Sequence, residues 1–402
     1  MTDQAGPIDQ EVRGDGIGED RLVLRIDNLE HLKAAYGEGA GLLACDMVDR
    51  ILRESGHRIV AVEQGVEGCV IVSSGAPLSR HALRRRLATT PVCTAGGAFH
   101  AVATLAEAPS AGGTGQPDGG LRRPPAFTAF SGEPPARGEA WAKRHRADMA
   151  KAAHLFQAIS TDRIALAWQP VVHAGTESIL YQECLLRILD GGRDILPIAE
   201  LLPAIERLGL ARVLDDYMLS RVLDELEAAD NVVLGVNISA QSAVFDDWWE
   251  PVALRLRAAP ALAARLVVEI TETAPFPSIS GAVSFVAELH ALGCRVALDD
   301  FGVGYASIRQ LLALRPDIVK IDRSFVARTG SSNHERDVFG RMVGLASTLA
   351  PIVIAEGIET ESHRKLAEQA GAIWQQGYHW GRPSGVRSWR AAPQRGREAA
   401  FH

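Results

Sequence analysis

Short apolar stretches alternate with longer amphipathic ones through the second half of the chain. Eight of the short stretches are strand candidates: IALAWQPVV, ILYQECLLRI, NVVLGVNIS, RLVVEIT, CRVALDD, DIVKID, PIVIAEG and AIWQQGY. Segments between them, such as SISGAVSFVAELHALG, carry apolar residues at helical spacing. Strands that alternate with helices imply a parallel sheet. Eight such units in about 230 residues match a closed (β/α)8 barrel. The alternative is an open doubly wound sheet, but no G-x-G-x-x-G motif follows the first strand of this sequence.

The residue pattern in the first half of the chain predicts a smaller α/β domain over residues 20–107. RLVLRID alternates like a strand, LEHLKAAYGEGAGLLACDMVDRILRE has helical spacing, and RIVAVEQGVEGCVIVSS resembles two strands around a turn. The remaining boundaries follow from composition. We expect a disordered tail over 1–19, a Gly/Pro-rich insertion or linker over 108–138, a connecting helix over 139–160, the barrel over 161–390 and a tail over 391–402.

Length, composition and charge narrow the class of protein. A chain of 402 residues with 47% hydrophobic residues favours two globular domains. The net charge of −7 gives no general positive field for DNA or an anionic membrane. No apolar stretch approaches the ~20 residues of a membrane span, and the acidic N-terminus lacks a signal peptide's pattern, so we expect a cytoplasmic protein. The five cysteines are scattered and form no CxxC, which argues against a disulfide framework or a zinc site.

Polar residues stand in or just after most of the strand candidates. They are Glu183, Asn237, Glu269, Asp299, Asp300, Lys320, Glu356 and Gln376. In a parallel barrel such residues converge on one mouth, where the active sites of this fold lie. Clustered carboxylates repel one another unless cations neutralise them, and carboxylate and amide oxygens suit Mg²⁺ or Mn²⁺. Any single carboxylate could instead cap a helix, and Arg187 could be a rim salt bridge or a phosphate clamp.

These residues lie in motifs that resemble the EAL domain, the cyclic di-GMP phosphodiesterase barrel. The motifs are ECLLR, VNIS, EITET, DDFGVGYASIRQL, DIVKIDRSFV, AEGIETES and QQGY followed by GRP, in the family's order from about Trp168 to Pro383. The resemblance implies a hydrolase that cuts cyclic di-GMP to linear pGpG with two Mg²⁺ or Mn²⁺ ions. It also implies a homodimer formed through the EAL domain.

The resemblance assigns a role to each matching position. One metal would be held by Glu183, Asn237, Glu269 and Asp299, and the second by Asp300, the shared Asp299 and Glu356. Lys320 would position or deprotonate the attacking water, and Gln376 would orient water or metal. Arg187 and Gln169 would contact the substrate. Glu272 would anchor the DDFGVGY loop, and Glu359 would support the site. Cys184 replaces the family's usual alanine, a small change that leaves the neighbouring carboxylate in place.

Residues 21–106 resemble, more weakly, the GGDEF diguanylate cyclase fold. Arg25 stands where that family has a metal-binding aspartate, and the signature turn is reduced to Gln64, Gly65, Val66, Glu67 and Gly68. Side chains at these turn positions would obstruct the approach of a nucleotide to the backbone. We therefore expect a regulatory domain without cyclase activity. The alternative for the whole chain is a catalytically weak or inactive receptor that binds cyclic di-GMP without cutting it.

Overall fold

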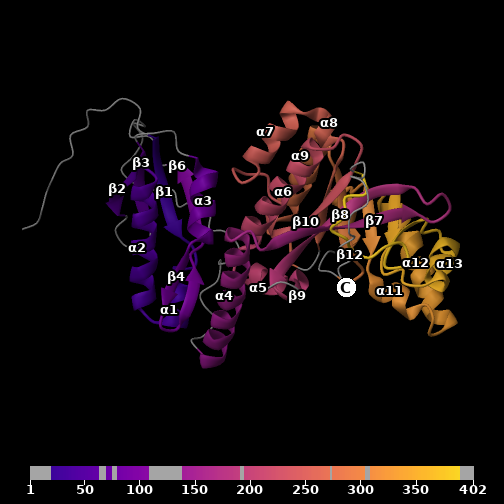
Figure 1. Cartoon of the computed structure of the whole chain (residues 1–402), viewed down its shortest axis with the longest axis horizontal. Helices are drawn as coiled ribbons and strands as arrows, with labels where there is room; N and C mark the ends of the chain where they lie inside the picture. Colours follow the sequence, from indigo (N-terminus) through magenta and orange to yellow (C-terminus); the bar gives the residue numbers. More distant parts are fainter. Residues whose placement is uncertain are drawn as a thin grey trace, which may run out of the picture.

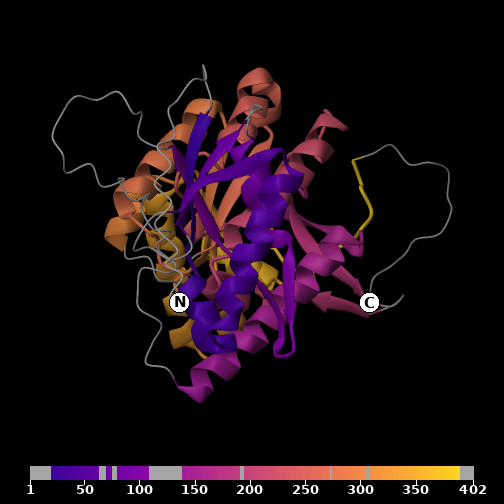
Figure 2. The ribbon, with the colours of Figure 1, turned by 90° about the vertical axis from the view of Figure 1, so that its left-hand side faces the viewer.

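The computed structural model describes residues 20–62, 69–74, 79–107, 138–190, 194–271, 274–303 and 308–389. The disordered tail predicted over 1–19, the tail predicted over 391–402 and nearly all of the insertion predicted over 108–138 lie outside these residues. Figure 1 shows a smaller N-terminal domain in indigo beside a larger C-terminal barrel coloured from magenta to yellow. Turned by 90°, the smaller domain lies in front of the barrel (Figure 2).

The N-terminal domain is built on a four-stranded antiparallel sheet. Its strands follow the order β2 (His57–Val62), β3 (Cys69–Ser74), β1 (Asp20–Ile26) and β6 (Ala103–Glu107). The other elements are α1 (Leu29–Tyr36), α2 (Gly39–Glu54), α3 (Arg80–Thr89) and the hairpin of β4 (Pro91–Thr94) and β5 (Gly97–His100). Alternate residues of β1, namely Leu22, Leu24 and Ile26, enter the core, because side chains two apart on a strand share a face.

A 22-residue helix, α4 (Glu139–Ser160), joins the two domains. Arg146 donates from Nη1 to the carbonyl oxygen of Ala35 on α1 at 2.6 Å. Asp148 accepts two hydrogen bonds, at 2.9 and 2.8 Å, from Arg207 of the barrel. Polar contacts from one stretch of this helix therefore reach both domains.

Eight strands close the barrel. They are β7 (Ile164–His173), β8 (Ile179–Asp190), β10 (Leu234–Ser239), β11 (Leu266–Thr271), β12 (Arg295–Phe301), β13 (Ile318–Ile321), β14 (Ile352–Ala355) and β15 (Trp374–Gln376). The ring closes where β8 pairs with β10 and where β15 pairs with β7. The predicted eight-stranded α/β barrel is thus confirmed. A short strand, β9 (Asp194–Pro197), extends the sheet beside β8 and was not predicted.

The prediction of a wholly parallel barrel is wrong for its first strand. β7 runs antiparallel to both of its neighbours, β8 and β15. Only residues 174–178 separate β7 from β8. A parallel crossover needs a dozen or more residues, whereas a short turn can only reverse the chain.

Helices surround the barrel, as Figure 1 shows. They are α5 (Leu202–Arg207), α6 (Ala211–Glu227), α7 (Glu250–Ala258), α8 (Pro260–Ala263), α9 (Ile279–Leu292), α10 (Ile308–Leu314), α11 (Arg323–Arg328), α12 (Asn333–Leu349) and α13 (Glu361–Gln369). Hydroxyl oxygens cap several of them: Ser278, Ser332 and Thr360 accept from the first turns of α9, α12 and α13. No helix in the described part of the chain is long and apolar enough to cross a membrane.

A buried histidine makes the stability of the N-terminal domain depend on pH. The Nδ1 of His100 lies 2.8 Å from the Ala88 carbonyl oxygen, and its Nε2 has no partner within the described part of the domain. Burial lowers the pKa of His100 to about 4 against the opposing effect of that hydrogen bond. The unfolded chain takes up this proton near pH 6.5, and the folded domain does not until about pH 4.

We therefore expect His100 to lower the free energy of unfolding by about 2 kcal/mol between pH 7 and pH 5, opposite in sign to buried carboxylates such as Glu269 and Asp300, whose raised pKa values add stability as pH falls. Urea unfolding of the full chain at pH 7 and pH 5 measures this loss. His100→Gln keeps a donor for the Ala88 carbonyl oxygen but does not titrate. Between pH 7 and pH 5 the free energy of unfolding of this variant should therefore fall by about 2 kcal/mol less than that of the wild type. An equal loss in both proteins would show that His100 is not responsible.

Candidate active site

An apolar layer inside the barrel supports a polar layer above it. The apolar layer consists of Val171, Tyr181, Val267, Ala297, Ile318 and Ile354. In five strands a polar residue follows two positions later, on the same face; these are Glu183, Glu269, Asp299, Lys320 and Glu356. In β7 the order is reversed, and Gln169 precedes Val171 because this strand runs the other way. The period of two thus brings the predicted polar residues to one level of the barrel.

The buried ammonium group of Lys320 lies among four carboxylates. Its Nζ is 2.7 Å from Glu269 Oε2, 2.8 Å from Glu356 Oε1, 3.2 Å from Asp299 Oδ2 and 3.4 Å from Glu183 Oε2. The lysine side chain is 0% exposed. A buried ammonium group needs an anionic partner, and the structure supplies four.

Two amide groups hold the Glu183 carboxylate in place. Asn237 on β10 donates from Nδ2 to Oε1 at 2.6 Å, and Gln376 on β15 donates from Nε2 to Oε2. Burial by itself raises the pKa of Glu183, but the Lys320 charge and these two donors outweigh burial and hold the pKa below its usual value. Glu183 therefore stays ionised at neutral pH.

The end of β12 directs two consecutive carboxylates to one site. Side chains of neighbouring strand residues normally point to opposite faces. Asp300 instead has a left-handed backbone with φ of 58°, and the pairing of β12 with β13 shifts register between Leu298 and Phe301. The Asp300 amide donates to Asp299 Oδ1 at 2.9 Å. Carboxylate oxygens of Asp299, Asp300 and Glu356 consequently lie within 4.8 Å of one another.

A glycine allows Glu356 to reach the cluster. Gly357 has φ of 70°, and a Cβ built on it would lie 2.5 Å from the Cβ of Arg323. No other residue type fits both this backbone and this spacing. The Glu356 backbone amide donates to the Ile321 carbonyl oxygen at 3.1 Å, which fixes the residue beside the end of β13.

The remaining carboxylates hold protons more readily than usual. Burial raises the pKa of Glu269 to about 8 and that of Asp300 to about 6. Burial likewise raises the pKa of Asp299, and it raises the pKa of Glu356 well above its ordinary value. Lys320 opposes these shifts but is a single cation. Burial alone would lower its pKa, yet the surrounding carboxylates hold the pKa of Lys320 well above its usual value.

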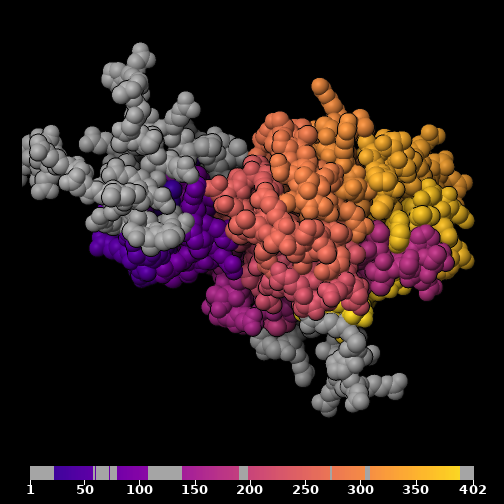
Figure 3. Space-filling model, turned by 90° about the horizontal axis from the view of Figure 1, so that it is seen from above, coloured from indigo at the N-terminus to yellow at the C-terminus, as the bar shows by residue number. Residues whose placement is uncertain are grey.

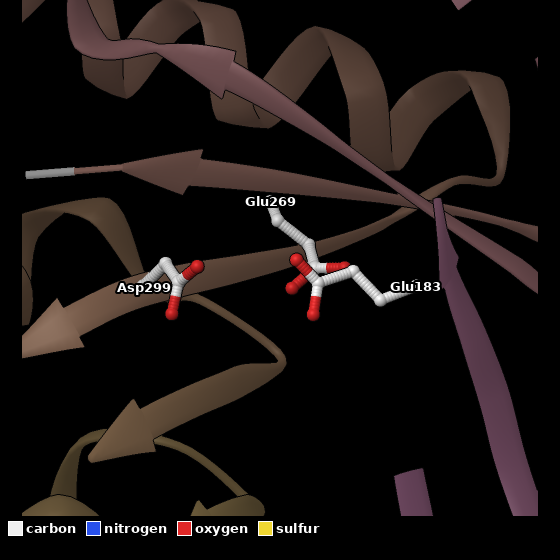
Figure 4. Close-up of side chains that lie close together, drawn as sticks. All are labelled: Glu183, Glu269 and Asp299. Carbon is white, nitrogen blue, oxygen red and sulfur yellow. The ribbon is translucent and has the colours of Figure 1, made fainter. Parts of the chain in front are cut away.

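Two overlapping groups of carboxylates could hold metal ions. Oxygens of Glu183, Glu269 and Asp299 lie within 4.8 Å of one another, and Asp299 is shared with the group that it forms with Asp300 and Glu356. Figure 4 shows the first group with its carboxylates turned toward each other. Asn237 Oδ1 and Glu269 Oε1 are buried without a hydrogen-bond partner in the described part of the barrel. Unused oxygen atoms at such a site suit a hard divalent cation.

The other predicted residues lie around this cluster or away from it. Arg187 is on the face of β8 that carries Glu183, four residues nearer the mouth, and is half-buried. Gln169 faces Glu183 across the β7–β8 pair but donates to the Gly381 carbonyl oxygen at 3.2 Å. Glu359 is exposed, and the described contacts do not join its carboxylate to the cluster. Glu272 lies outside the described residues, as do residues 304–307 of the DDFGVGY loop.

Two residues near the site were not predicted. Tyr181 is fully buried under the cluster, and burial raises its pKa well above the ordinary value, with Glu269 adding to this shift and Lys320 opposing it. Its place two residues before Glu183 was the signal that could have identified it. Asp215 on α6 accepts hydrogen bonds from Ser239 N at 2.9 Å and Ser242 Oγ at 2.5 Å, and so fixes the end of β10. A helical aspartate gives no such signal in sequence.

A family model described as the EAL domain matches residues 152–383, which is more than half of the chain. The chain belongs to the EAL domain family. The resemblance noted in the sequence over Trp168 to Pro383 is confirmed for the barrel.

Curated relatives of this EAL domain include named enzymes. Cyclic di-GMP phosphodiesterase PdeF of Escherichia coli is 28% identical over 254 residues, which are 61% of this chain and 34% of PdeF. The bifunctional diguanylate cyclase/cyclic di-GMP phosphodiesterase MucR of Pseudomonas aeruginosa is 28% identical over 236 residues, covering 57% of this chain and 34% of MucR. An uncharacterized signaling protein of Caulobacter vibrioides is 30% identical, with 60% of this chain and 30% of that protein covered. The match thus spans about a third of these relatives' length.

Solved EAL structures resemble the same region. The PaMucR phosphodiesterase in complex with c-di-GMP has a TM-score of 0.51 and 26% identity, covering 58% of this chain and 96% of that one. The FimX EAL domain from Pseudomonas aeruginosa bound to c-di-GMP has a TM-score of 0.50 and 26% identity, covering 60% and 98%. The similarity therefore spans nearly the whole of both solved chains and the barrel of this one.

The packing under Glu269 gives a test of the site. A Cβ on Gly235 of β10 would lie 2.2 Å from Glu269 Oε1 and 2.7 Å from the Tyr181 ring. We expect Gly235→Ala to displace one of these side chains, to lower the free energy of unfolding by about 1–3 kcal/mol, and to weaken Mn²⁺ binding. Urea unfolding and Mn²⁺ titration measure the two effects.

Gly344 on the exposed face of α12 is the matched control, because a Cβ there meets nothing within 4 Å. Gly344→Ala should stabilise the chain by about 0.5–1 kcal/mol through the better helix propensity of alanine. Mn²⁺ binding should not change in this control. If Gly235→Ala were as stable as the control and bound Mn²⁺ normally, the close packing around Glu269 would not constrain the site.

Proposed function

We propose that the barrel hydrolyses cyclic di-GMP to linear pGpG with the help of two divalent cations, Mg²⁺ or Mn²⁺. The observation that carries the proposal is the pair of carboxylate groups that share Asp299. Membership of the EAL family supports it. So do the names of relatives such as PdeF, a cyclic di-GMP phosphodiesterase.

The charge of the cluster fits two divalent ions. Five carboxylates, those of Glu183, Glu269, Asp299, Asp300 and Glu356, surround one ammonium group. Fully ionised, five negative charges and one positive charge leave four negative charges. The raised pKa values of four of the carboxylates show that protons partly offset this excess. Two divalent cations would neutralise it without protons.

When bound, two such cations would lower the pKa of a water and neutralise charge on the attacking and leaving oxygens. Glu183, Asn237, Glu269 and Asp299 would hold one ion, and Asp299, Asp300 and Glu356 the other. The surrounding carboxylates hold the pKa of Lys320 well above its usual value, so without metal its ammonium group is a hydrogen-bond donor, and in the proposed reaction Lys320 would position or deprotonate the attacking water. Gln376 fixes Glu183, and Arg187 offers its guanidinium at the mouth for a phosphate of the substrate.

We propose that the N-terminal domain is a degenerate GGDEF-like domain that regulates the barrel and makes no cyclic di-GMP. The order β1, α1, α2, β2, β3, α3 around an antiparallel sheet supports this view. Arg25, at the position expected for a metal-binding aspartate, instead pairs with Asp27 at 2.6 Å. The signature turn, residues 64–68, lies outside the described residues.

Dimerisation through the EAL domain and a cytoplasmic location stay predictions. Val303, Ile308 and Leu312 are exposed apolar residues on and just before α10. Large exposed apolar side chains that cluster on one element suit a contact with a second copy. The expectation of no DNA partner rests on charge alone, at −7 for the whole chain.

The shared carboxylate predicts how substitutions affect metal binding. Titration calorimetry with Mn²⁺ should give two sites in the wild-type chain. Asp299→Asn should weaken both sites, because Asp299 belongs to both carboxylate groups, whereas Glu356→Gln should weaken one. Glu227→Gln, which changes an exposed carboxylate on α6, is the control and should bind as wild type. Loss of a single site in Asp299→Asn would contradict the shared arrangement.

A product assay tests the reaction itself. Purified chain incubated with cyclic di-GMP and Mn²⁺ should yield pGpG, separated by chromatography. Glu183→Gln should lower kcat by at least about 100-fold, because it removes a proposed metal ligand that both Lys320 and the amides orient. Glu227→Gln again serves as control. Binding of cyclic di-GMP without pGpG formation would favour the receptor alternative and reject the hydrolase.

A further inference from the structure

A cavity of about 400 Å³ lies between the N-terminal domain and the barrel. Residues of β6 and α3 line one side, and residues at the start of α6 and just before α7 line the other. Figure 3 shows the indigo surface of the N-terminal domain against the part of the barrel that carries these helices. This cavity is separate from the carboxylate cluster, none of whose residues lines it. Its volume is in the range of small-molecule sites.

Most charges around the cavity are paired. Arg212 of α6 donates to both Asp246 oxygens at 2.7 and 2.5 Å. Arg80 of α3 lies 3.0 Å from Asp247, and Asp27 pairs with Arg25. Three aspartates and three arginines are thus matched one to one, with each pair at hydrogen-bond distance.

Arg84 is the cation left over. It is 7% exposed, and its Nη2 donates to the Leu105 carbonyl oxygen at 2.5 Å. Its nearest carboxylate, that of Asp247, is 3.6 Å away and already engaged by Arg80. The Nε and Nη1 groups of Arg84 have no acceptor in the described structure. A buried guanidinium with unused donors costs free energy unless an anion meets it.

The pKa of Arg84 reflects its buried and partly uncompensated charge. Burial lowers the pKa of its guanidinium, against the attraction of Asp247 and Asp246. The nearby charges of Arg212 and Arg80 lower that pKa further. The aspartates around the cavity therefore compensate Arg84 only in part.

We propose that this interdomain cavity binds a small phosphate ester through Arg84. The guanidiniums of Arg80, Arg84 and Arg212 converge on it from both domains. A phosphate carries more charge than a carboxylate and accepts from several guanidinium donors, so it can compete with aspartates that already occupy Arg80 and Arg212. The Trp248 ring also lines the cavity; its centroid lies 5.6 Å from the Arg212 guanidinium and 6.0 Å from that of Arg84, so an organic group that contacts this ring lies beside both cations.

The position of the cavity links it to the active site through one helix. Arg212 stands one turn before Asp215 on α6. Asp215 holds Ser239 N and Ser242 Oγ at the end of β10, and β10 carries Asn237, which donates to Glu183. A ligand that draws Arg212 toward α3 therefore acts on a helix that fixes part of the carboxylate cluster.

Titration calorimetry on the full chain tests the proposal. The chain is first freed of metal with a chelator, because a metal ion in the carboxylate cluster could itself bind phosphate. The probes are inorganic phosphate, 5′-GMP and acetate at equal ionic strength. We expect both phosphate compounds to bind, and Arg84→Met to weaken their binding at least about tenfold, the loss of one charge-assisted hydrogen bond. Tighter binding of 5′-GMP than of phosphate would support a contact of the organic part with Trp248.

Arg86→Met is the matched control. Arg86 lies on the same helix but pairs with Glu54 on α2 and does not line the cavity, so binding should change less than about twofold. Circular dichroism checks that each variant folds. If Arg84→Met does not fold, Arg84→Lys takes its place, because it keeps the positive charge and removes the planar guanidinium donors. Arg84→Lys should also weaken phosphate binding. Absence of saturable phosphate binding, equal binding by the Arg84 variants and wild type, or acetate binding as tightly as phosphate would overturn the proposal.

Discussion

One buried ammonium group governs the mouth of this barrel. Lys320 brings four carboxylates to within 3.4 Å of its Nζ, and each carboxylate comes from a different strand or strand end. Without that cation these groups would repel one another in a medium where water screens them poorly. Carboxylates from β8, β11, β12 and the residue after β14 can therefore lie together because β13 presents a positive charge among them. The same charge keeps Glu183 ionised, while burial raises the pKa values of the other carboxylates.

The layering under this cluster explains how much could be predicted from sequence. Short apolar runs between helical segments identified all eight barrel strands, and the convergence of strand ends at one mouth brought Glu183, Glu269 and Lys320 together; the structure adds that these side chains share a level because residues two apart on a strand share a face. Periodicity does not record direction, so the reversal of β7 appeared only as the inverted order of Gln169 and Val171. The sequence of β12 gives no warning of the left-handed Asp300 either, although that one residue makes two neighbouring aspartates face one site.

Some residue roles carried over from family motifs fall in loops, and loops were the least predictable part. Glu359 follows a motif residue by three positions yet is exposed to solvent. Asp215, which no motif marked, fixes the end of β10 through two hydrogen bonds. The difference is physical: a strand position determines which way a side chain faces, whereas a helix or loop residue reaches a site only through tertiary packing. Sequence patterns therefore locate the proposed metal ligands better than the residues that hold those side chains in position.

The interface between the domains is polar where it meets the helices that support the site. His81 of α3 lies 2.6 Å from Asp216, the neighbour of Asp215 on α6, and Asp148 of α4 pairs with Arg207 of α5. Domain interfaces of this kind exchange charge pairs when the domains shift, whereas an apolar interface would have to expose its core. Because α6 presents Asp216 to the N-terminal domain and Asp215 to β10, movement of one domain against the other acts directly on the strand that carries Asn237. The fold thus connects this interdomain contact to the proposed metal ligand Asn237 by a short path through α6 and β10.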